Sequence, residues 1–308
     1  MVPENDSERW FTCFQIDDIR SSGACFTRRL LSSSLRTNRE TVAAIRGIPL
    51  RFLFFHIEIL TGDIALFDLS GRTAVITGGS TGIGMGIAHA LAAAGCNVML
   101  SGRNTERLQQ AVERIRAAGG IAAATAGDVA DEVAVQHLFA ETDRHFGPLD
   151  LLVNNAGAFD GGPVEEVSLE AWNRVMGACL TGAFLCTREA FRRMKPRQSG
   201  RVLNIGSISA QRPRMNSAPY TASKFGVLGL THATALEGRA HGISVSCLHP
   251  GNVLVERRVN SGLTSDEEPM MTVEAITRAA ITMLTMPPNV NFLEAIVLPT
   301  EQLYIGRG

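Results

Sequence analysis

The chain has 308 residues, 45% of them hydrophobic and 19% charged, which suits one globular domain of about 250 residues with a full core plus an extension. Its formal net charge of -1 gives no electrostatic reason to expect nucleic acid or an anionic membrane as a partner. The six cysteines have no Cys-x-x-Cys spacing and the seven histidines no His-x-x-x-His spacing, which favours reduced thiols in a cytoplasmic protein over disulfides or a metal site. No apolar run is long enough to span a membrane.

Residues 1–64 carry no steady hydrophobic period, and a regular pattern begins only near Ala65. The start of the chain lacks the basic and apolar regions of a secretory signal. We therefore expect an N-terminal extension over residues 1–64 that is poorly ordered or not part of the core, and one folded domain over residues 65–308. A targeting or partner-binding arm is the alternative, but no motif in this stretch supports it.

From Gly71 onward, short apolar runs alternate with longer amphipathic or alanine-rich runs. The short runs predict strands over residues 73–77, 96–101, 121–126, 149–153, 202–205, 243–248 and 293–298. The longer runs predict a first helix that ends near Ala94 and further helices over residues 105–118, 131–146, 169–194, 218–241 and 273–286. Strands that alternate with helices form right-handed βαβ units, so the pattern predicts an α/β fold with a doubly wound, parallel sheet of seven strands.

A glycine-rich turn follows the first expected strand. It reads Thr77-Gly-Gly-Ser-Thr-Gly-Ile-Gly84, and an alanine-rich helix comes next. Glycine permits a tight turn and the close approach of a pyrophosphate, which the free N–H groups at the helix N-terminus attract. A tight packing corner is the alternative interpretation of the glycines alone. Their place between a strand and a helix favours a nucleotide site, and the absence of a following Gly-Lys-Ser/Thr excludes a P-loop.

The end of the second expected strand bears on which nucleotide is bound. A carboxylate there would bind the ribose 2′-hydroxyl of NAD, but this chain has Ser101-Gly-Arg103-Asn104 and no acid. The guanidinium of Arg103 suits a 2′-phosphate, so the sequence favours NADP over NAD. The alternative is that Arg103 only covers the solvated start of the next helix.

Tyr220 and Lys224 are the strongest candidates for catalysis. They stand four residues apart after Ser217 and Pro219, which are typical of a helix start, so both side chains lie on one helix face. An ammonium beside a phenol stabilises the phenolate and lowers the phenol's pKa, which lets Tyr220 exchange a proton with a substrate oxygen that Ser207 also binds. Of the 29 Lys and Arg residues only two are lysines, which suggests that an ammonium is required here. A surface Tyr and Lys on an ordinary amphipathic helix is the alternative.

These motifs, taken together, resemble the classical short-chain dehydrogenase/reductase family over nearly all of residues 65–308, and the family's fold is a Rossmann-type doubly wound sheet. Ser207, Tyr220 and Lys224 match the family's catalytic residues, including the spacing of 13 from Ser to Tyr. The resemblance implies that Lys224 also holds the nicotinamide ribose and that Asp128 meets the adenine. The cofactor-binding residues that it implies are Gly78, Ser80, Thr81, Gly82, Ile83, Gly84, Arg103, Asp128, Val129, Asn155, Ala156, Gly157, Tyr220, Lys224, Pro250, Gly251 and Val253.

The resemblance implies an enzyme that interconverts a carbonyl and a secondary alcohol on a small substrate, and Arg103 favours NADP(H) as its cofactor over NAD. Hydride would pass between the nicotinamide and the substrate carbon while Tyr220 exchanges the proton, so no metal is needed. Two other functions stay open: reduction of an activated carbon–carbon double bond, and cofactor binding with little catalysis. Family members commonly assemble through two of their helices, so we expect a homodimer or a homotetramer.

Two positions depart from the family's pattern. Cys179 stands where the family often has an asparagine that helps to hold a water linked to the lysine, and Val255 stands where a threonine often contacts the cofactor. A main-chain carbonyl near Cys179 could still hold that water, whereas a nucleophilic role for the thiol lacks an identifiable base. Phe159 and Arg214 fall on loops that we expect to flank the mouth of the pocket.

Overall fold

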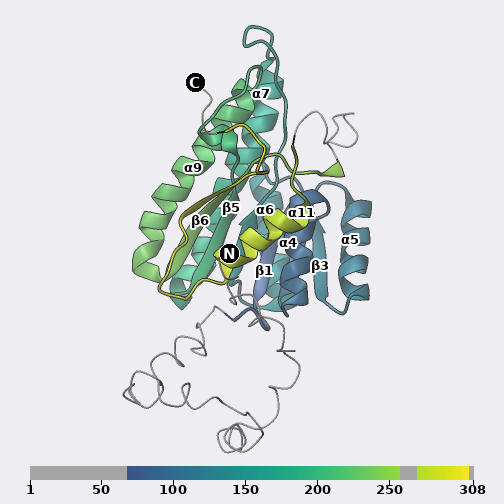
Figure 1. Cartoon of the computed structure of the whole chain (residues 1–308). Helices are drawn as coiled ribbons and strands as arrows, with labels where there is room; N and C mark the ends of the chain where they lie inside the picture. The colour runs from purple at the N-terminus through teal and green to yellow at the C-terminus, as the bar shows by residue number, and fades with distance from the viewer. Residues whose placement is uncertain (1–67, 257–268, 305–308) are drawn as a thin grey trace, which may run out of the picture. The chain divides into compact units, whose positions relative to one another are not determined.

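The computed structural model describes residues 68–256 and 269–304 (Figure 1), so the extension expected over residues 1–64 lies outside the description. Within the described ranges, seven parallel strands form one sheet, as predicted, and their order is β3-β2-β1-β4-β5-β6-β7. The strands are β1 (Thr73–Thr77), β2 (Asn97–Gly102), β3 (Ile121–Ala126), β4 (Leu151–Asn154), β5 (Gly200–Ile205), β6 (Ile243–Pro250) and β7 (Glu294–Val297). The direction of strand addition reverses between β1 and β4, and ligands of such sheets bind at the carboxyl ends beside this switch point.

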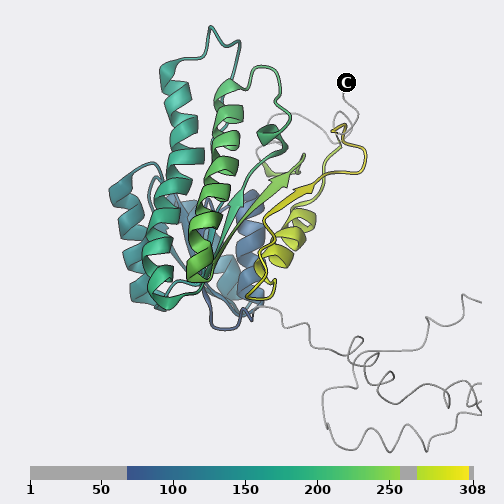
Figure 2. The ribbon, with the colours of Figure 1, turned by 90° about the vertical axis from the view of Figure 1, so that its left-hand side faces the viewer.

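Helices cover both faces of the sheet (Figures 1 and 2). They are α4 (Gly82–Ala93), α5 (Thr105–Ala117), α6 (Glu132–Phe146), α7 (Leu169–Met176), α8 (Gly182–Met194), α9 (Ala218–Gly238) and α11 (Val273–Leu284). Alternate strand residues face opposite ways: Ile76 belongs to the core beneath α4, α5 and α11, whereas its neighbour Val75 belongs to the core beneath α6 and α8. Both side chains are fully buried, as expected for a parallel sheet that is covered on both faces.

Local sequence explains where several helices begin. Asn104 caps α5 by accepting a hydrogen bond from the main-chain nitrogen of Arg107 (2.8 Å), and the side chains of Asp131 and Thr272 cap α6 and α11 in the same way. The apolar residues of α5 recur at the helical period and form its buried face: Leu108, Ala111, Val112 and Ile115.

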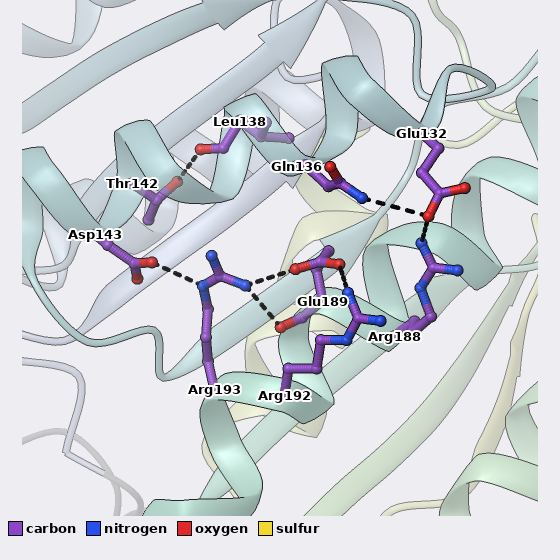
Figure 3. A network of polar contacts seen from close by, with 9 residues as sticks. All are labelled: Glu132, Gln136, Leu138, Thr142, Asp143, Arg188, Glu189, Arg192 and Arg193. Atoms are coloured by element: carbon purple, nitrogen blue, oxygen red, sulfur yellow. Dashed lines mark hydrogen bonds and ion pairs between the residues drawn. The ribbon is translucent and has the colours of Figure 1, made fainter.

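Ion pairs connect α6 with α8 (Figure 3). Arg193 on α8 bonds to Asp143 on α6 (Nε to Oδ2, 2.9 Å) and to Glu189 on its own helix (Nη1 to Oε2, 2.8 Å). Arg188 on α8 pairs with Glu132, the first residue of α6. These contacts hold α8 against α6, and the N-terminal end of α8 leads toward the site described below.

The single helix predicted over residues 169–194 is wrong in its middle. A π-helical turn, η3 (Gly177–Thr181), separates α7 from α8. The chain packs closely here, since a methyl group on Gly182 would stand 2.5 Å from Cγ2 of Val129 in the loop after β3. One extra residue in a turn does not disturb the apolar period on either side, so periodicity could not reveal it. Such turns occur frequently at functional sites.

The other predicted elements are confirmed, with ends that differ by a few residues. β6 continues two residues further than predicted, to Pro250, and α9 ends at Gly238, where a 3₁₀ turn (Arg239–His241) follows. In residues 68–256 and 269–304, none of the helices has the length and apolar character that crossing a membrane requires.

Candidate active site

A cavity of about 640 Å³ lies at the carboxyl ends of β1, β4, β5 and β6. It brings together the glycine turn, the Asn-Asn-Ala-Gly element, the predicted catalytic residues and the Pro-Gly loop. Its wall includes the predicted site residues Gly78, Thr81, Gly82, Ile83, Asn155, Ala156, Gly157, Ser207, Tyr220, Lys224, Pro250, Gly251 and Val253. Ser80, Gly84, Arg103, Asp128 and Val129 are not part of this wall. Phe159 and Arg214 do line it, as the position of their loops predicted.

The glycine turn is pinned to the loop after β4. Nδ2 of Asn155 donates hydrogen bonds to the main-chain oxygens of Thr77 and Gly78, both at 3.0 Å. In return, Oγ1 of Thr77 accepts the main-chain N–H groups of Asn155 and Ala156, also at 3.0 Å. Gly78 has a φ of 61°, in the left-handed region that favours glycine. The turn therefore holds the N-terminus of α4, with its free N–H groups, against the cavity.

The ends of β2 and β3 lie side by side next to this turn. Ser101 and Gly102 pair with Thr125 and Ala126, and no carboxylate follows β2 before α5 begins. Arg103 is exposed beside this cap of α5, which Asn104 provides, so its position is compatible both with a 2′-phosphate contact and with a solvated residue at the start of the helix.

Tyr220 and Lys224 lie on the first turns of α9 and share a face, as their spacing predicted. Nζ of Lys224 lies 5.6 Å from the centre of the Tyr220 ring and donates a hydrogen bond to the main-chain oxygen of Ile205 (2.8 Å). Ser207 follows β5, and its Oγ accepts a hydrogen bond from the main-chain nitrogen of Ser209 (3.1 Å). The Tyr220 ring packs edge-on against Phe159, with ring centres 5.3 Å apart.

The model of the short chain dehydrogenase family matches residues 72–266. The chain belongs to this family. It is 38% identical over 203 residues to gluconate 5-dehydrogenase from Gluconobacter oxydans, a match that covers 66% of this chain and 78% of that protein. It is 39% identical over 185 residues to acetoacetyl-CoA reductase from Shinella zoogloeoides, covering 60% and 75% respectively. The fold also matches a crystal structure of an actinorhodin polyketide ketoreductase variant with NADPH, with a TM-score of 0.71 and 29% sequence identity. This match covers 77% of this chain and 99% of that one.

Membership makes the chain a dehydrogenase or reductase that acts on an alcohol or a carbonyl, as predicted.

Cys179 is the first of the two positions that depart from the pattern expected of this short chain dehydrogenase. The Cys179 thiol is buried inside η3 and bonds only to the main chain of Ala158 among the described residues, accepting from its nitrogen and donating to its oxygen at 3.3 Å each. The thiol thus fixes the loop after the Asn-Asn-Ala-Gly element, and in residues 68–256 and 269–304 no base bonds to it that would support a nucleophile.

The second departure, Val255, lies in the cavity wall, of which Cys179 is not a part. A methyl group on Gly82 would stand 3.2 Å from Cγ1 of Val255, so this side chain closes against the glycine turn. An apolar contact therefore stands at the position where a hydroxyl contact was expected from the family's pattern.

His249 belongs to the site although no motif in the sequence marks it as functional. The imidazole is fully buried under the loop that carries Ser207, with Nδ1 2.8 Å from the Ser207 main-chain oxygen. Burial lowers the pKa of His249 below its ordinary value of 6.5, and this effect outweighs the hydrogen bond to Ser207, which raises it. The one available signal was its position directly before Pro250-Gly251, at the end of a strand.

Proposed function

We propose that this short chain dehydrogenase is an NADP(H)-dependent oxidoreductase that interconverts a carbonyl and a secondary alcohol on a small substrate. The observation that carries the proposal is that Ser207, Tyr220 and Lys224 line one cavity together with the glycine turn. The catalytic domain would extend over residues 65–308.

The site fits a dinucleotide. The cavity is large, the N-terminus of α4 faces it, and the left-handed glycine at position 78 leaves the main chain open to a pyrophosphate. Asn155, Ala156, Pro250, Gly251 and Val253 would complete the cofactor's surroundings. When bound, the cofactor supplies or accepts the hydride at its nicotinamide ring.

The residues of the chain would handle the proton and the substrate oxygen. Because Oγ of Ser207 already accepts a bond from Ser209, its own hydrogen is left to donate to a substrate oxygen. Tyr220 would give its proton to that oxygen in reduction and remove it in oxidation. Lys224 would stabilise the phenolate and hold the nicotinamide ribose, and its hydrogen bond to the main-chain oxygen of Ile205 fixes the position of the ammonium.

The mechanism is tested by following NADPH absorbance with purified protein and a substrate panel. The panel holds β-keto esters and thioesters, sugar acids, diketones, aldehydes and enones, because the relatives named above include a gluconate dehydrogenase and a ketoacyl thioester reductase. Tyr220→Phe should keep NADPH affinity and lower turnover roughly 10²-fold or more, the usual contribution of general acid–base catalysis. Unchanged turnover in Tyr220→Phe would remove the proposed role of the phenol.

The preference for NADP rests on Arg103 and on the missing carboxylate after β2. Arg103→Ala should weaken NADPH binding about tenfold or more and leave NADH binding within about twofold, because only NADPH carries the 2′-phosphate. Fluorescence titration of both cofactors measures this, and an equal loss for both would contradict a 2′-phosphate contact.

The two alternatives predict different results in the same panel. Turnover of enones but not of ketones would favour reduction of a carbon–carbon double bond. NADPH binding without any turnover would favour a cofactor-binding protein.

A homodimer or homotetramer also stays a proposal, which the half-exposed side chains of Phe184 on α8 and Phe225 on α9 support. A cytoplasmic location, expected from the cysteine pattern, stays a prediction.

A further inference from the structure

His249 occupies a place that is shaped for its ring. It lies at the end of β6, and its side chain has no exposed surface. Nδ1 lies 2.8 Å from the main-chain oxygen of Ser207 and 3.3 Å from the main-chain nitrogen of the same residue. A methyl group on Gly206 would stand 2.6 Å from Nδ1 and 2.8 Å from Cε1 of the ring. Residue 206 therefore has no room for a side chain, and the imidazole packs directly against the strand end that carries Ser207.

The distances assign the proton to Nδ1 of neutral His249. The main-chain N–H of Ser207 also points at Nδ1, but at 3.3 Å this contact is weaker than the 2.8 Å contact to the Ser207 main-chain oxygen, which has the usual length of an N–H···O hydrogen bond. Without a proton on Nδ1, two lone pairs would face each other at 2.8 Å. We therefore assign the Nδ1–H tautomer from the hydrogen-bond geometry. It donates to the main-chain oxygen of Ser207 and holds that carbonyl in place.

The other ring nitrogen faces a carboxylate without bonding to it. Nε2 of His249 is buried and makes no hydrogen bond within the described part of the chain, although Oε1 of Glu294 lies 3.4 Å away. Glu294 begins β7 and is itself held by Nε2 of Gln211, which donates to Oε1 at 2.6 Å. A proton added to Nε2 would thus find a fixed anionic partner within reach.

The charges around His249 keep it neutral near pH 7. Burial is the largest cause of its lowered pKa, and Lys224 and His232 on α9 lower it further, while Glu294 on β7 and the bond to Ser207 raise it. On its own strand the neighbouring ionisable group is the thiol of Cys247, whose pKa burial raises to about 11, so that it carries no charge here. The ring therefore takes up a second proton only at acid pH.

We propose that His249 and Glu294 are positioning residues, in which neutral His249 holds the Ser207 main chain and its protonation draws the ring toward Glu294 and lowers turnover. Charge-assisted N–H···O bonds are roughly 2.7–2.9 Å long, so closing the present gap moves Nε2 by about half an ångström. A catalytic group must be held within roughly that distance of its productive position. The proposal deepens the proposed function, because it assumes that the Ser207 hydroxyl binds the substrate oxygen.

Three variants separate the hydrogen bond, the titration and the packing. His249→Asn places an amide N–H near the position of Nδ1–H and keeps the bond to Ser207, but it has no titrating nitrogen. His249→Leu fills a similar volume and has no donor. Glu294→Gln keeps an oxygen for Gln211 and removes the charge that His249 faces.

The kinetic test measures kcat for carbonyl reduction from acid to neutral pH in the four proteins. At neutral pH, His249→Leu should lower kcat about tenfold or more and His249→Asn less than about threefold, since only the leucine variant loses the Ser207 bond. In the native protein kcat should fall as the pH drops below 6.5, this fall should be absent in His249→Asn, and in Glu294→Gln it should move to lower pH. NADPH affinity, measured by fluorescence, should stay within about twofold in every variant.

Two results would overturn the proposal. One is equal kcat in the asparagine and leucine variants at neutral pH, which would mean that His249 only fills space and that its hydrogen bond to Ser207 does not affect turnover. The other is an acid fall that survives unchanged in His249→Asn, because another group would then cause it. If the leucine variant does not fold, the asparagine and glutamine variants still decide the second point.

A spectrum of the resting protein decides the geometric half without turnover. Long-range proton–nitrogen NMR should show one imidazole in the Nδ1–H form that titrates below 6.5 and is missing from His249→Asn. An Nε2–H form, or titration at or above 6.5, would overturn the assignment. If the native protein turns over no carbonyl in the panel, the proposed function fails, while the spectrum still supports or refutes the His249–Glu294 pair.

Discussion

Gly84 gives a sharp test of how the cofactor turn is built. It lies in the first turn of α4, behind the turn and outside the cavity wall. A methyl group on this residue would overlap the main-chain oxygen of Gly78 and Nδ2 of Asn155, and would stand 3.0 Å from the Gly78 carbonyl carbon. Neither neighbour can move freely, because Nδ2 of Asn155 is held by hydrogen bonds to Thr77 and Gly78.

The size of the effect of Gly84→Ala follows from three terms. Helix propensity alone favours alanine over glycine by about 1 kcal/mol. Overpacking against fixed atoms costs roughly 1–3 kcal/mol, and losing or stretching the two Asn155 bonds costs about 1 kcal/mol each. The free energy of unfolding should therefore fall by about 2–4 kcal/mol, which for a domain of this size lowers Tm by roughly 4–16 °C.

Urea unfolding and NADPH fluorescence titration measure both consequences in Gly84→Ala. The displaced turn should weaken NADPH binding about tenfold or more, a change of about 1.4 kcal/mol. Gly162→Ala is the matched control, because a methyl group there meets nothing within 4 Å, and it should leave stability within about 1 kcal/mol and NADPH affinity unchanged. If the two variants behave alike, the reasoning about the pinned turn is wrong.

Two further predictions concern the body of the domain. Asp150→Ala should lower the free energy of unfolding in urea by about 2–4 kcal/mol, because this buried carboxylate pairs with Arg72 (3.1 Å) and Arg197 (2.8 Å). As a control, Asp143→Ala removes a more exposed ion pair and should change the free energy of unfolding by less than about 1 kcal/mol. Equal losses in the two variants would contradict the role of burial. Burial raises the pKa of Cys186 to about 12, so its thiol should stay protonated and unlabelled by iodoacetamide at pH 8 in the native protein and react once urea unfolds it. Mass spectrometry of the labelled peptides checks this, and rapid native labelling would show that the side chain is accessible.

The sequence predicted the parts of the fold that depend on local period. The strand over residues 121–126 matches the structure because a short apolar run is bounded there by turns, and the buried face of α5 matches because its hydrophobic residues repeat at the helical period. The switch between β1 and β4 follows from alternating strands and helices, which leave few possible topologies. The turn η3 escaped prediction because the hydrophobic pattern does not distinguish a π-helical turn from the α-helix on either side of it, and because its packing joins Gly182 to Val129, which are far apart in sequence.

In the candidate site too, contacts within one helix could be predicted from the sequence, whereas contacts between distant segments could not. Tyr220 and Lys224 could be paired in advance because four residues of helix bring them together, and their spacing alone fixes the shared face. The role of Cys179 could not be predicted, because its hydrogen bonds reach Ala158 on another loop and depend on where the π-helical turn directs the thiol. The family's pattern flagged the residue as unusual, but only the contact shows what it does.

The role of His249 could be recognised only from the register between two strands of the sheet. In the register of β5 with β6, Asn204 lies opposite Cys247 and Ile205 opposite Leu248, so Gly206 comes next to His249 at the carboxyl end. The glycine at 206 and the imidazole at 249 therefore depend on each other, because a side chain at 206 would occupy the space of the ring on the neighbouring strand. Each residue by itself is ordinary, a glycine before a serine and a histidine before a proline. Once the register is known, the pair accounts for both, because the ring fills the space beside Gly206 and donates to the main chain of the residue that follows it.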